Sequence, residues 1–227
     1  MRRAWLRNLA VWTPPDGALA GAPEARFLPP LVRRRCDDLT RALLHVAREC
    51  ASPEQLAACA CVFASRHASL SALVELLEAL AAGKPLSPNT FSHSVHNAPA
   101  GVFSVWAQNR HACSSLAAGR ESFACGWLEA LGLLARDPTR DVLLVCGDEF
   151  PLAPLTPHAA APAPTHALAV LLGSSGAGAP IELALEAAPE NAEARAEPDE
   201  LAFARWWAGD AAVLALAHSG RRWLLRR

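Results

Sequence analysis

Three short, almost wholly apolar segments constrain the fold of this chain more than any other feature. They are residues 57–63 (AACACVF), 141–146 (DVLLVC) and 167–172 (ALAVLL). Each has the length of a strand, and a strand that is apolar on both faces must be covered on both sides by other elements. Stretches with helical periodicity separate them. This order predicts an α/β fold in which a sheet is layered with helices.

Helices are predicted where apolar residues recur at spacings of three and four. The clearest spans residues 69–82, with its leucines on one face and Gly83 at its end. The other predicted helices are 31–51, 117–134 and 201–209. Further strands are predicted at 6–12, 101–106 and 221–227, and the last of these is expected at an edge of the sheet. Loops are predicted at 86–97, 151–164 and 190–200, and the loop at 190–200 is rich in acidic residues and expected to be mobile.

Composition excludes several classes of protein. Hydrophobic residues make up 52% of the 227 residues and charged residues 19%, which indicates a globular chain. The net charge of −1 argues against a nucleic-acid partner. No apolar run reaches the roughly 18 residues of a membrane span, and residues 1–7 lack the apolar stretch of a signal peptide. The seven cysteines, set mostly among Ala, Leu and Val, indicate reduced thiols and a cytoplasmic protein.

Two groups of possible metal ligands are too small to form a metal site. Cys59 and Cys61 share one face of their predicted strand, with no further ligand nearby in sequence. His93 and His96 lie three apart in a predicted loop, again without an obvious third ligand. We therefore expect no metal and no cofactor. The histidine loop, which includes Asn97, is interpreted as a packed loop or as a contact for a ligand or partner.

Three other features leave alternatives open. Residues 33–35 (RRR) indicate a solvated loop at a helix start or a contact for an acidic partner. Asp148 and Glu149 follow an apolar strand and are interpreted as its polar cap. Cys113 has His111 nearby, but a reactive cysteine needs a base or a helix N-terminus to stabilise its thiolate. Because Cys113 precedes the predicted helix, a buried packing thiol is favoured over a catalytic one.

Small residues at 117–126 mark a junction from strand to helix, which is where a nucleophile elbow sits in many hydrolytic and acyl-transfer folds. Backbone amides at such a junction supply an oxyanion hole. The apex, however, consists of Ala118, Gly119 and Arg120, so it carries neither serine nor cysteine. Cys125 lies inside the predicted helix and is interpreted as a packing thiol.

The order of several segments resembles that of a known family. These segments are 28–40, 86–101 (LSPNTFSHSVHNAPAG), 115–119 (SLAAG), 122–130 (SFACGWLEA) and 141–149 (DVLLVCGDE). Together they resemble the β-ketoacyl-synthase-like family of short chain-length-factor proteins, which is related to the N-terminal half of condensing enzymes. The resemblance covers about residues 1–175. It implies a thiolase-like fold, half of a condensing-enzyme fold, in one domain over 1–227 with its core at 1–175 and a C-terminal extension at 176–227.

The departures from the family pattern imply a protein without catalysis. A condensing enzyme carries a nucleophilic cysteine at the elbow apex, and here that apex is degenerate at Ala118, Gly119 and Arg120. The two histidines that complete such a site belong to the second half of the enzyme, and His166 and His218 lack the Gly/Thr-rich surroundings of those histidines. The resemblance thus implies a pseudoenzyme that pairs with a ketosynthase.

In that role the chain forms a heterodimer with a β-ketoacyl-ACP synthase and shapes the tunnel for an acyl chain held on an acyl carrier protein. The resemblance points to fatty-acid-like, polyketide or aryl polyene biosynthesis, with no cofactor. The candidates for the tunnel wall are Leu73, Leu76 and Leu77. The candidates for the partner interface are Phe103, Trp106 and Asn109, in a region that matches the dimer interface of the family.

Two other functions compete with this one. The first is a thiol-dependent acyltransferase or thioesterase that uses Cys113 with His93, His96 or His111. The second is a homodimeric structural remnant of the fold, which has no tunnel role and binds no ketosynthase.

Overall fold

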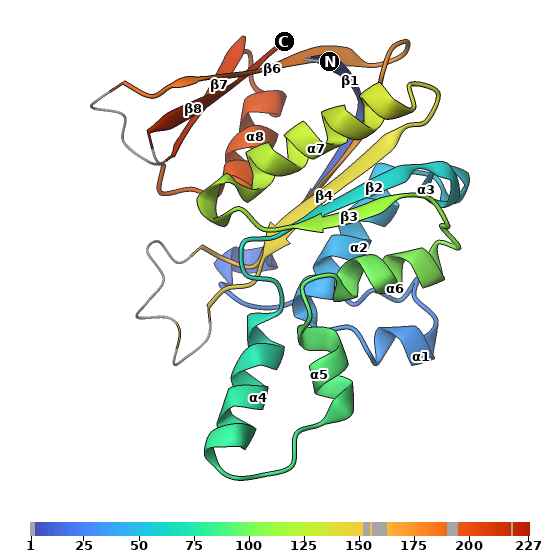
Figure 1. Cartoon of the computed structure of the whole chain (residues 1–227), viewed down its shortest axis with the longest axis vertical. Helices are drawn as coiled ribbons and strands as arrows, with labels where there is room; N and C mark the ends of the chain where they lie inside the picture. The colour runs from blue at the N-terminus through green and yellow to red at the C-terminus, as the bar shows by residue number, and fades with distance from the viewer. Residues whose placement is uncertain (1–2, 152–154, 156–162, 190–194, 219) are drawn as a thin grey trace.

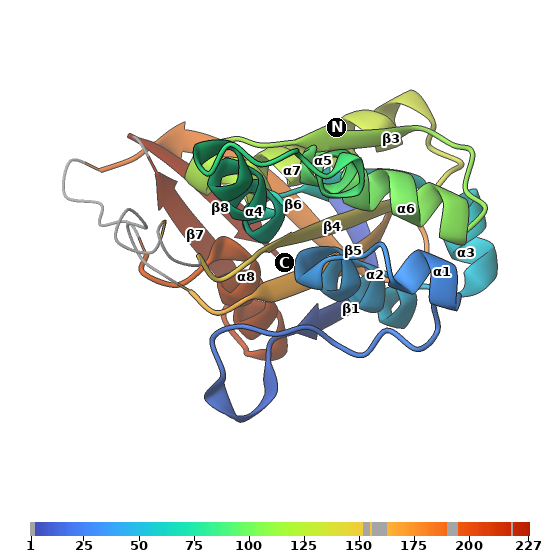
Figure 2. The same ribbon diagram turned by 90° about the horizontal axis from the view of Figure 1, so that it is seen from below.

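The computed structural model describes residues 3–151, 155, 163–189, 195–218 and 220–227. Their strands form one eight-stranded mixed sheet with helices on both faces (Figure 1), which Figure 2 shows from below. The strands are β1 (Arg3–Trp12), β2 (Ala60–Ala64), β3 (Cys113–Leu116), β4 (Val142–Asp148), β5 (His166–Gly173), β6 (Ala179–Ala187), β7 (Val213–His218) and β8 (Arg221–Arg226). Their order across the sheet is β3-β2-β4-β5-β1-β6-β8-β7. The predicted α/β fold, a mixed sheet layered with helices, is confirmed.

The described residues also form eight α-helices. They are α1 (Pro30–Arg33), α2 (Asp38–Cys50), α3 (Pro53–Ala58), α4 (Leu70–Ala81), α5 (Pro88–Ser94), α6 (Ala98–Trp106), α7 (Ser122–Arg136) and α8 (Asp199–Ala208). Helices α2 and α6 pack on one face of the sheet, and α7 and α8 pack on the other. Helices α4 and α5 project away from the sheet as a hairpin (Figure 1). None of the described helices is long and apolar enough to cross a membrane.

The central strands show why the apolar segments predicted this architecture. Side chains of β4 alternate between two cores, so that Leu144 and Cys146 face α7 and α8 while Leu143 and Val145 face α2. Both faces of the strand are therefore buried, and every position must be apolar. Strand β2 pairs in parallel with β3 and β4, and all the other described strand pairs are antiparallel.

The strand predicted at 101–106 is wrong, since these residues belong to helix α6. Val, Phe and Trp favour strands, but Pro99 stands in the first turn of the helix and the spacing of the large residues suits a helix. Phe103 and Trp106 lie three apart and both pack on the core beneath α2. Tertiary packing thus overrides the local preference for a strand.

Other boundaries differ as well. Part of the loop predicted at 86–97 is helix α5, whose first turn is capped by the Ser87 hydroxyl. The predicted helix 31–51 is two helices, α1 and α2, and α2 begins where the Asp37 carboxylate accepts a hydrogen bond from the Thr40 amide. Residues 57–58 end helix α3 before β2 begins. The loop prediction at 151–164 falls largely on residues outside the described ranges. In the acidic segment predicted as a mobile loop at 190–200, residues 190–194 also lie outside them, but Asp199 and Glu200 are buried in the first turn of helix α8, so the loop prediction is wrong at these two residues.

The segment after residue 175 adds three strands to the same sheet. Strand β6 pairs with β1, and β8 pairs with both β6 and β7. The edge strand predicted at 221–227 is therefore wrong in its position, because β8 lies inside the sheet and β7 forms the edge. Strands β3, β6 and β7 were not predicted. Strand β3 is only four residues long (CSSL) and lacks an apolar pattern.

Candidate functional site

A cavity of about 360 Å³ opens where strand β4 ends and strand β5 begins. Its wall comes from segments far apart in the sequence: Leu70 and Leu73 of α4, the turn before α7, the end of β4 and the start of α8. The apolar wall of α4 faces a wall of charged side chains. A cavity with apolar walls and a few convergent polar groups is the usual form of a binding site.

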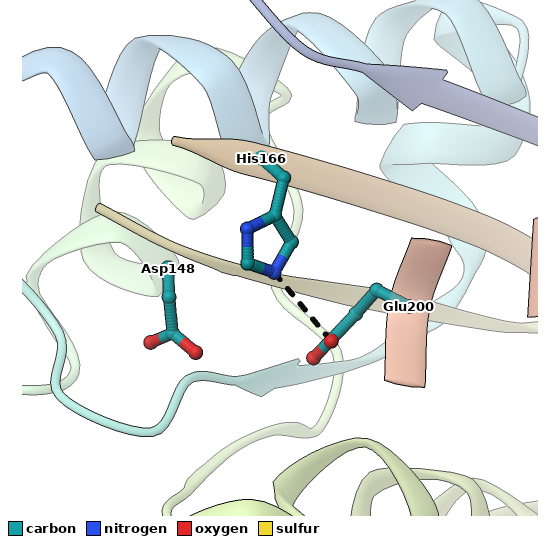
Figure 3. Close-up of side chains that lie close together, drawn as sticks. All are labelled: Asp148, His166 and Glu200. Carbon is teal, nitrogen blue, oxygen red and sulfur yellow. Dashed lines mark ion pairs between the residues drawn. The ribbon is translucent and has the colours of Figure 1, made fainter. Parts of the chain in front are cut away.

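Three titratable side chains that line this cavity, Asp148, His166 and Glu200, lie close together (Figure 3). The antiparallel register of β4 and β5 places Asp148 opposite His166. Glu200, in the first turn of α8, lies on the other side of the imidazole, with its Oε2 3.5 Å from His166 Nε2. The ligand atoms of the three residues all lie within 4.8 Å of one another.

The buried charges change the acidity of these groups. Burial raises the pKa of Asp148, and the nearby Glu200 carboxylate raises it further. Burial alone would lower the pKa of His166, but Glu200 and Asp148 together raise it above its usual value. Glu149, also buried, accepts hydrogen bonds from the Ser71 amide (2.9 Å) and hydroxyl (3.0 Å), and burial raises its pKa.

A second buried pair lies on the same cavity wall. His218, at the end of β7, has its Nε2 2.8 Å from Asp199 Oδ2. Burial raises the pKa of Asp199. The two histidines that the sequence set aside, His166 and His218, thus line one cavity together.

The strand-to-helix junction also faces the cavity, through Gly119 and Arg120. Gly119 has a φ of 58°, in the left-handed region that favours glycine. The Ser122 hydroxyl accepts a hydrogen bond from the Ala118 amide (3.0 Å) and donates one to the Gly119 carbonyl (2.7 Å). The Ala118 amide is therefore already occupied and is not free to serve an oxyanion hole.

Glu121 ties this junction to the C-terminal strands. Its buried carboxylate accepts hydrogen bonds from Arg221 Nη2 (2.9 Å) and from Trp223 Nε1 (3.0 Å), both on β8. The segment after residue 175 thus helps to hold the junction in place.

Comparison with known proteins shows to which family this chain belongs. A family model described as "Beta-ketoacyl synthase, N-terminal domain" matches residues 4–225. The chain belongs to the β-ketoacyl synthase N-terminal domain family. The match continues past residue 175, where the resemblance seen in the sequence ended. No curated protein matches the sequence.

Solved structures agree with this family. A chain in the complex of a ketosynthase (ApeO) with its chain length factor (ApeC) from Xenorhabdus doucetiae has a TM-score of 0.80 at 23% identity, over 100% of both chains. A chain of the ishigamide ketosynthase/chain length factor has a TM-score of 0.65 at 15% identity, over 82% of this chain and 68% of that one. A chain in a complex of a type II PKS acyl-carrier protein with its ketosynthase has a TM-score of 0.61 at 10% identity, over 83% and 70%. At these identities the likeness concerns the fold, and it confirms the thiolase-like, half-condensing-enzyme fold.

In this β-ketoacyl synthase domain, Cys113 is exposed, so the expectation of a buried packing thiol is wrong at this position. It begins strand β3 next to Cys61 in the register of β2 and β3, and it does not line the cavity. A hydrogen bond with the Cys61 thiol lowers the pKa of Cys113. Cys36, Cys50, Cys59, Cys61 and Cys146 are buried, as expected.

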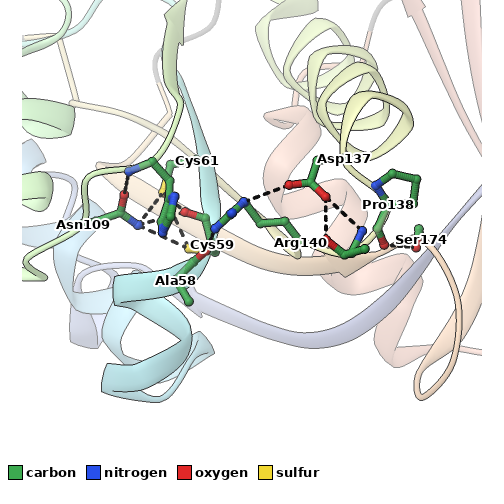
Figure 4. A network of polar contacts seen from close by, with 10 residues as sticks. Ala58, Cys59, Cys61, Asn109, Asp137, Pro138, Arg140 and Ser174 are labelled. Carbon is green, nitrogen blue, oxygen red and sulfur yellow. Dashed lines mark hydrogen bonds and ion pairs between the residues drawn. The ribbon is translucent and has the colours of Figure 1, made fainter.

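Asn109 belongs to a buried polar network beside these thiols (Figure 4). Its Nδ2 donates hydrogen bonds to the carbonyls of Leu56 (2.6 Å) and Cys59 (2.9 Å), and the Cys59 and Cys61 sulfurs lie 3.7 Å apart. Its Oδ1 accepts a hydrogen bond from the His111 amide. Asn109 thus holds the turn between α6 and β3, and its side chain does not reach the surface.

The other interface candidates lie on α6. Phe103 is fully buried, with its ring centroid 5.5 Å from that of Phe63. Trp106 is half-buried against Phe27, at 5.0 Å between centroids. Phe103 and Asn109 are therefore buried in this chain by its own core, while Trp106 stays a predicted partner contact.

The tunnel candidates lie on helix α4. Leu73 and Leu77 are 41% and 50% exposed, and Leu76 is half-buried. Of the three, Leu73 lines the cavity. The apolar face of the predicted helix 69–82 is thus only partly covered by the rest of the chain. The buried residues of α4 are Leu70, Ala72 and Val74.

The histidine loop makes contacts within the chain. His93 Nδ1 lies 2.6 Å from the Asn89 carbonyl, within α5, and His96 Nε2 lies 3.0 Å from the Ser65 carbonyl. Asn97 is exposed and precedes α6 without capping it. His93 thus lies in a helix and not in a loop, and His96 is the residue of this group that contacts a distant segment of the chain.

The residues that the sequence missed are Asp148, His166 and Glu200 as a group. A signal existed, because Asp148 directly follows one apolar strand and His166 directly precedes another. Bringing the two together requires these strands to be antiparallel neighbours in one register, and this pairing is not visible in the pattern of either strand alone.

Proposed function

We propose that this chain is a non-catalytic partner subunit of a β-ketoacyl-ACP synthase, in the manner of a chain length factor. One observation carries the proposal: the apex of the junction is Ala118, Gly119 and Arg120, of which Gly119 and Arg120 line the cavity, and none of the three is the nucleophile that acyl transfer through the enzyme would need there. No cysteine is among the described residues that line the cavity. A subunit of this kind needs a partner that supplies the nucleophile, and a solved structure of similar fold is a ketosynthase in complex with its chain length factor.

A surface for such a partner lies on the α4–α5 hairpin, residues 70–94. It bears the exposed apolar side chains Leu73, Leu77, Leu80, Leu86 and Phe91. An exposed apolar cluster of this kind marks a protein contact. Since Leu73 also lines the cavity, we propose that Leu73, Leu76 and Leu77 form part of an acyl tunnel that the partner completes.

Strand β3 offers a second surface to a partner. It lies at one edge of the sheet and pairs only with β2, so its outer side is open to a strand of another chain. The region that the family resemblance gave as the dimer interface includes this strand. The acyl chain would be held on an acyl carrier protein, in fatty-acid-like, polyketide or aryl polyene biosynthesis.

The proposal is tested by co-expressing the chain with the ketosynthase encoded beside it, with a tag on this chain alone. We expect a stoichiometric heterodimer, and condensation that is lost when this chain is omitted. A homodimer that ignores the ketosynthase would instead support a structural remnant and contradict the proposal.

Charges on the hairpin are expected to break the complex. Replacing Leu73 and Leu77 by aspartate should weaken binding of the ketosynthase by at least about 10-fold, because two apolar contacts would become buried, unpaired charges. The matched control is Leu185→Asp, a leucine exposed to the same degree (51%). It lies on β6, a strand at the opposite end of the molecule from the hairpin (Figure 1). Affinity is measured by interferometry, and equal losses for both variants would contradict the assignment of this surface.

The exposed thiol keeps a thiol-dependent enzyme as the second candidate function. We expect Cys113 to be alkylated faster than the other cysteines, because it is exposed and its pKa is lowered by Cys61, whereas burial raises the pKa of Cys50 to about 12. Fast labelling alone therefore does not indicate catalysis. Cys113→Ser should leave condensation by the heterodimer unchanged, and the chain alone should not cleave acyl thioesters. Loss of condensation in Cys113→Ser, or thioester cleavage by the unaltered chain that Cys113→Ser abolishes, would favour the enzyme.

A further inference from the structure

We propose that Asp148, His166 and Glu200 form a site for one divalent cation of the Zn²⁺ class. The proposal is independent of the partner function, which requires no metal. The three residues come from the end of β4, the start of β5 and the first turn of α8. No single segment of the sequence therefore contains a recognisable metal-binding motif. One imidazole nitrogen and two carboxylates suit a borderline-soft cation such as Zn²⁺ or Co²⁺.

The spacing of the ligand atoms fits a tetrahedral centre. Ligands about 2.0–2.2 Å from a zinc ion lie roughly 3.5 Å from one another. His166 Nε2 and Glu200 Oε2 are already 3.5 Å apart, and Asp148 completes a group whose ligand atoms lie within 4.8 Å of one another. A small inward movement of the Asp148 carboxylate would close the site, and the cavity leaves room for a water as fourth ligand.

The imidazole is prepared to act as a ligand. His166 is 3% exposed, and its Nε2 has no hydrogen-bond partner among the described residues. Its Nδ1 lies 2.9 Å from the Pro164 carbonyl, a contact that requires the proton to be on Nδ1. Nε2 is then the ring nitrogen that is left to bind a metal ion in the cavity. A backbone carbonyl behind the non-ligating nitrogen is the usual support of a metal-bound histidine.

The two carboxylates differ in their hydrogen bonds. Asp148 Oδ1 accepts hydrogen bonds from the Ser65 hydroxyl (2.7 Å) and the amides of Arg66 (2.8 Å) and His67 (3.2 Å). Its Oδ2 forms no hydrogen bond within the described residues. Glu200 is 5% exposed and likewise accepts no hydrogen bond from them, so His166 is the group that faces its buried charge. A carboxylate that lines a cavity without a protein donor is stabilised by a cation, a proton or water.

The charges around the three ligands favour binding of a divalent cation. Glu149 and Asp199 add two further buried carboxylates to the cavity wall. Arg66, Arg120 and Arg195 lie on the same wall and reduce this surplus of negative charge without reaching the three ligands by any ion pair in the described structure. The competing occupant is a proton on His166 Nε2, shared with the carboxylates, and the experiment below separates the two.

The test uses the full-length chain after removal of metal with a chelator, and Co²⁺ followed by Zn²⁺ as probes. We expect one equivalent of Co²⁺ to bind, with visible absorption of a four- or five-coordinate centre and without the charge-transfer band of a thiolate ligand. His166→Gln and Glu200→Gln should each weaken binding by at least about 10-fold. The matched control His218→Gln, a histidine equally buried on the same wall, should bind the metal like the unaltered chain.

Three results would overturn the proposal. They are the absence of stoichiometric uptake by the unaltered chain, uptake that persists in both ligand variants, and a thiolate band that disappears in Cys113→Ser, which would place the metal on the exposed thiol. Should the variants fail to fold, by circular dichroism in chelator, ¹⁵N-histidine NMR of the unaltered chain decides. Zn²⁺ should shift the Nε2 signal of one of the eight histidines, and no shift, with a protonated ring instead, would leave the proton as the occupant.

Discussion

Replacing Gly147 by alanine is expected to lower the free energy of unfolding by about 3 kcal/mol or more, because the new methyl group has no room. Its Cβ would stand 2.3 Å from the His166 carbonyl oxygen and 3.0 Å from Ala167 Cα, closer than real Cβ atoms come to the backbone of a neighbouring strand. Gly147 pairs with Ala167 in the middle of the sheet, so the two strands must move apart. Because Asp148 and His166 flank this contact, the cavity floor should be disturbed as well.

The measurement is urea denaturation followed by circular dichroism. The matched control is Gly132→Ala, in the exposed part of α7, where a Cβ meets nothing within 4 Å. There alanine should stabilise the chain by about 0.5–1 kcal/mol, through its better helix propensity. Opposite signs for the same substitution would show that the close approach of β4 and β5 causes the loss, and equal effects at both sites would contradict this explanation.

Replacing Phe203 by alanine should cost about 3–5 kcal/mol of stability. Phe203 is fully buried on α8, with ring centroids 5.3 Å from Phe123, 5.2 Å from Trp127 and 5.5 Å from Trp206. Phe203 thus joins α8 to α7 through a cluster of aromatic rings. A small side chain at this position would leave the space of the phenyl ring unfilled. The neighbouring rings come from two rigid helices, so the space left by the deleted ring should collapse only in part.

Phe203→Leu serves as the control and should cost no more than about 1.5 kcal/mol, because leucine keeps most of the apolar volume. Both are measured by urea denaturation, with the slope of the transition checked for a change in the cooperative unit. A loss for alanine below about 1 kcal/mol would mean that α8 is not held by this cluster. Since Glu200 lies on the same helix, the leucine variant should retain metal binding while the alanine variant weakens it.

The sequence predicted the centre of the fold better than its edges. Strands β4 and β5 were recognisable because burial on both faces leaves an uninterrupted apolar run. Helix α6 was missed because Val102, Phe103 and Trp106 favour strands locally and only packing beneath α2 makes them helical. Strand β3 was missed because four residues at a sheet edge carry too little pattern for a prediction.

The candidate site was predictable in part. The degenerate apex at Ala118 and Gly119 was visible because a nucleophile is a matter of residue type at one position. The cluster of Asp148, His166 and Glu200 depends instead on the register of β4 with β5 and on the docking of α8. Such relations between distant segments are fixed by the whole fold, and single segments do not contain them.

The place of β1 in the sheet has a consequence for how the chain acquires its structure. The first strand of this sequence lies between β5 and β6, so both of its neighbours are translated more than 150 residues later. On the ribosome, β1 therefore emerges with two unpaired edges, and the centre of the sheet forms only after β6 has been made. Closure over such long loops is slow, and the waiting strand is open to pairing with other nascent chains. Efficient production of this chain should accordingly depend on chaperones that bind its early part until nearly the whole sequence is available.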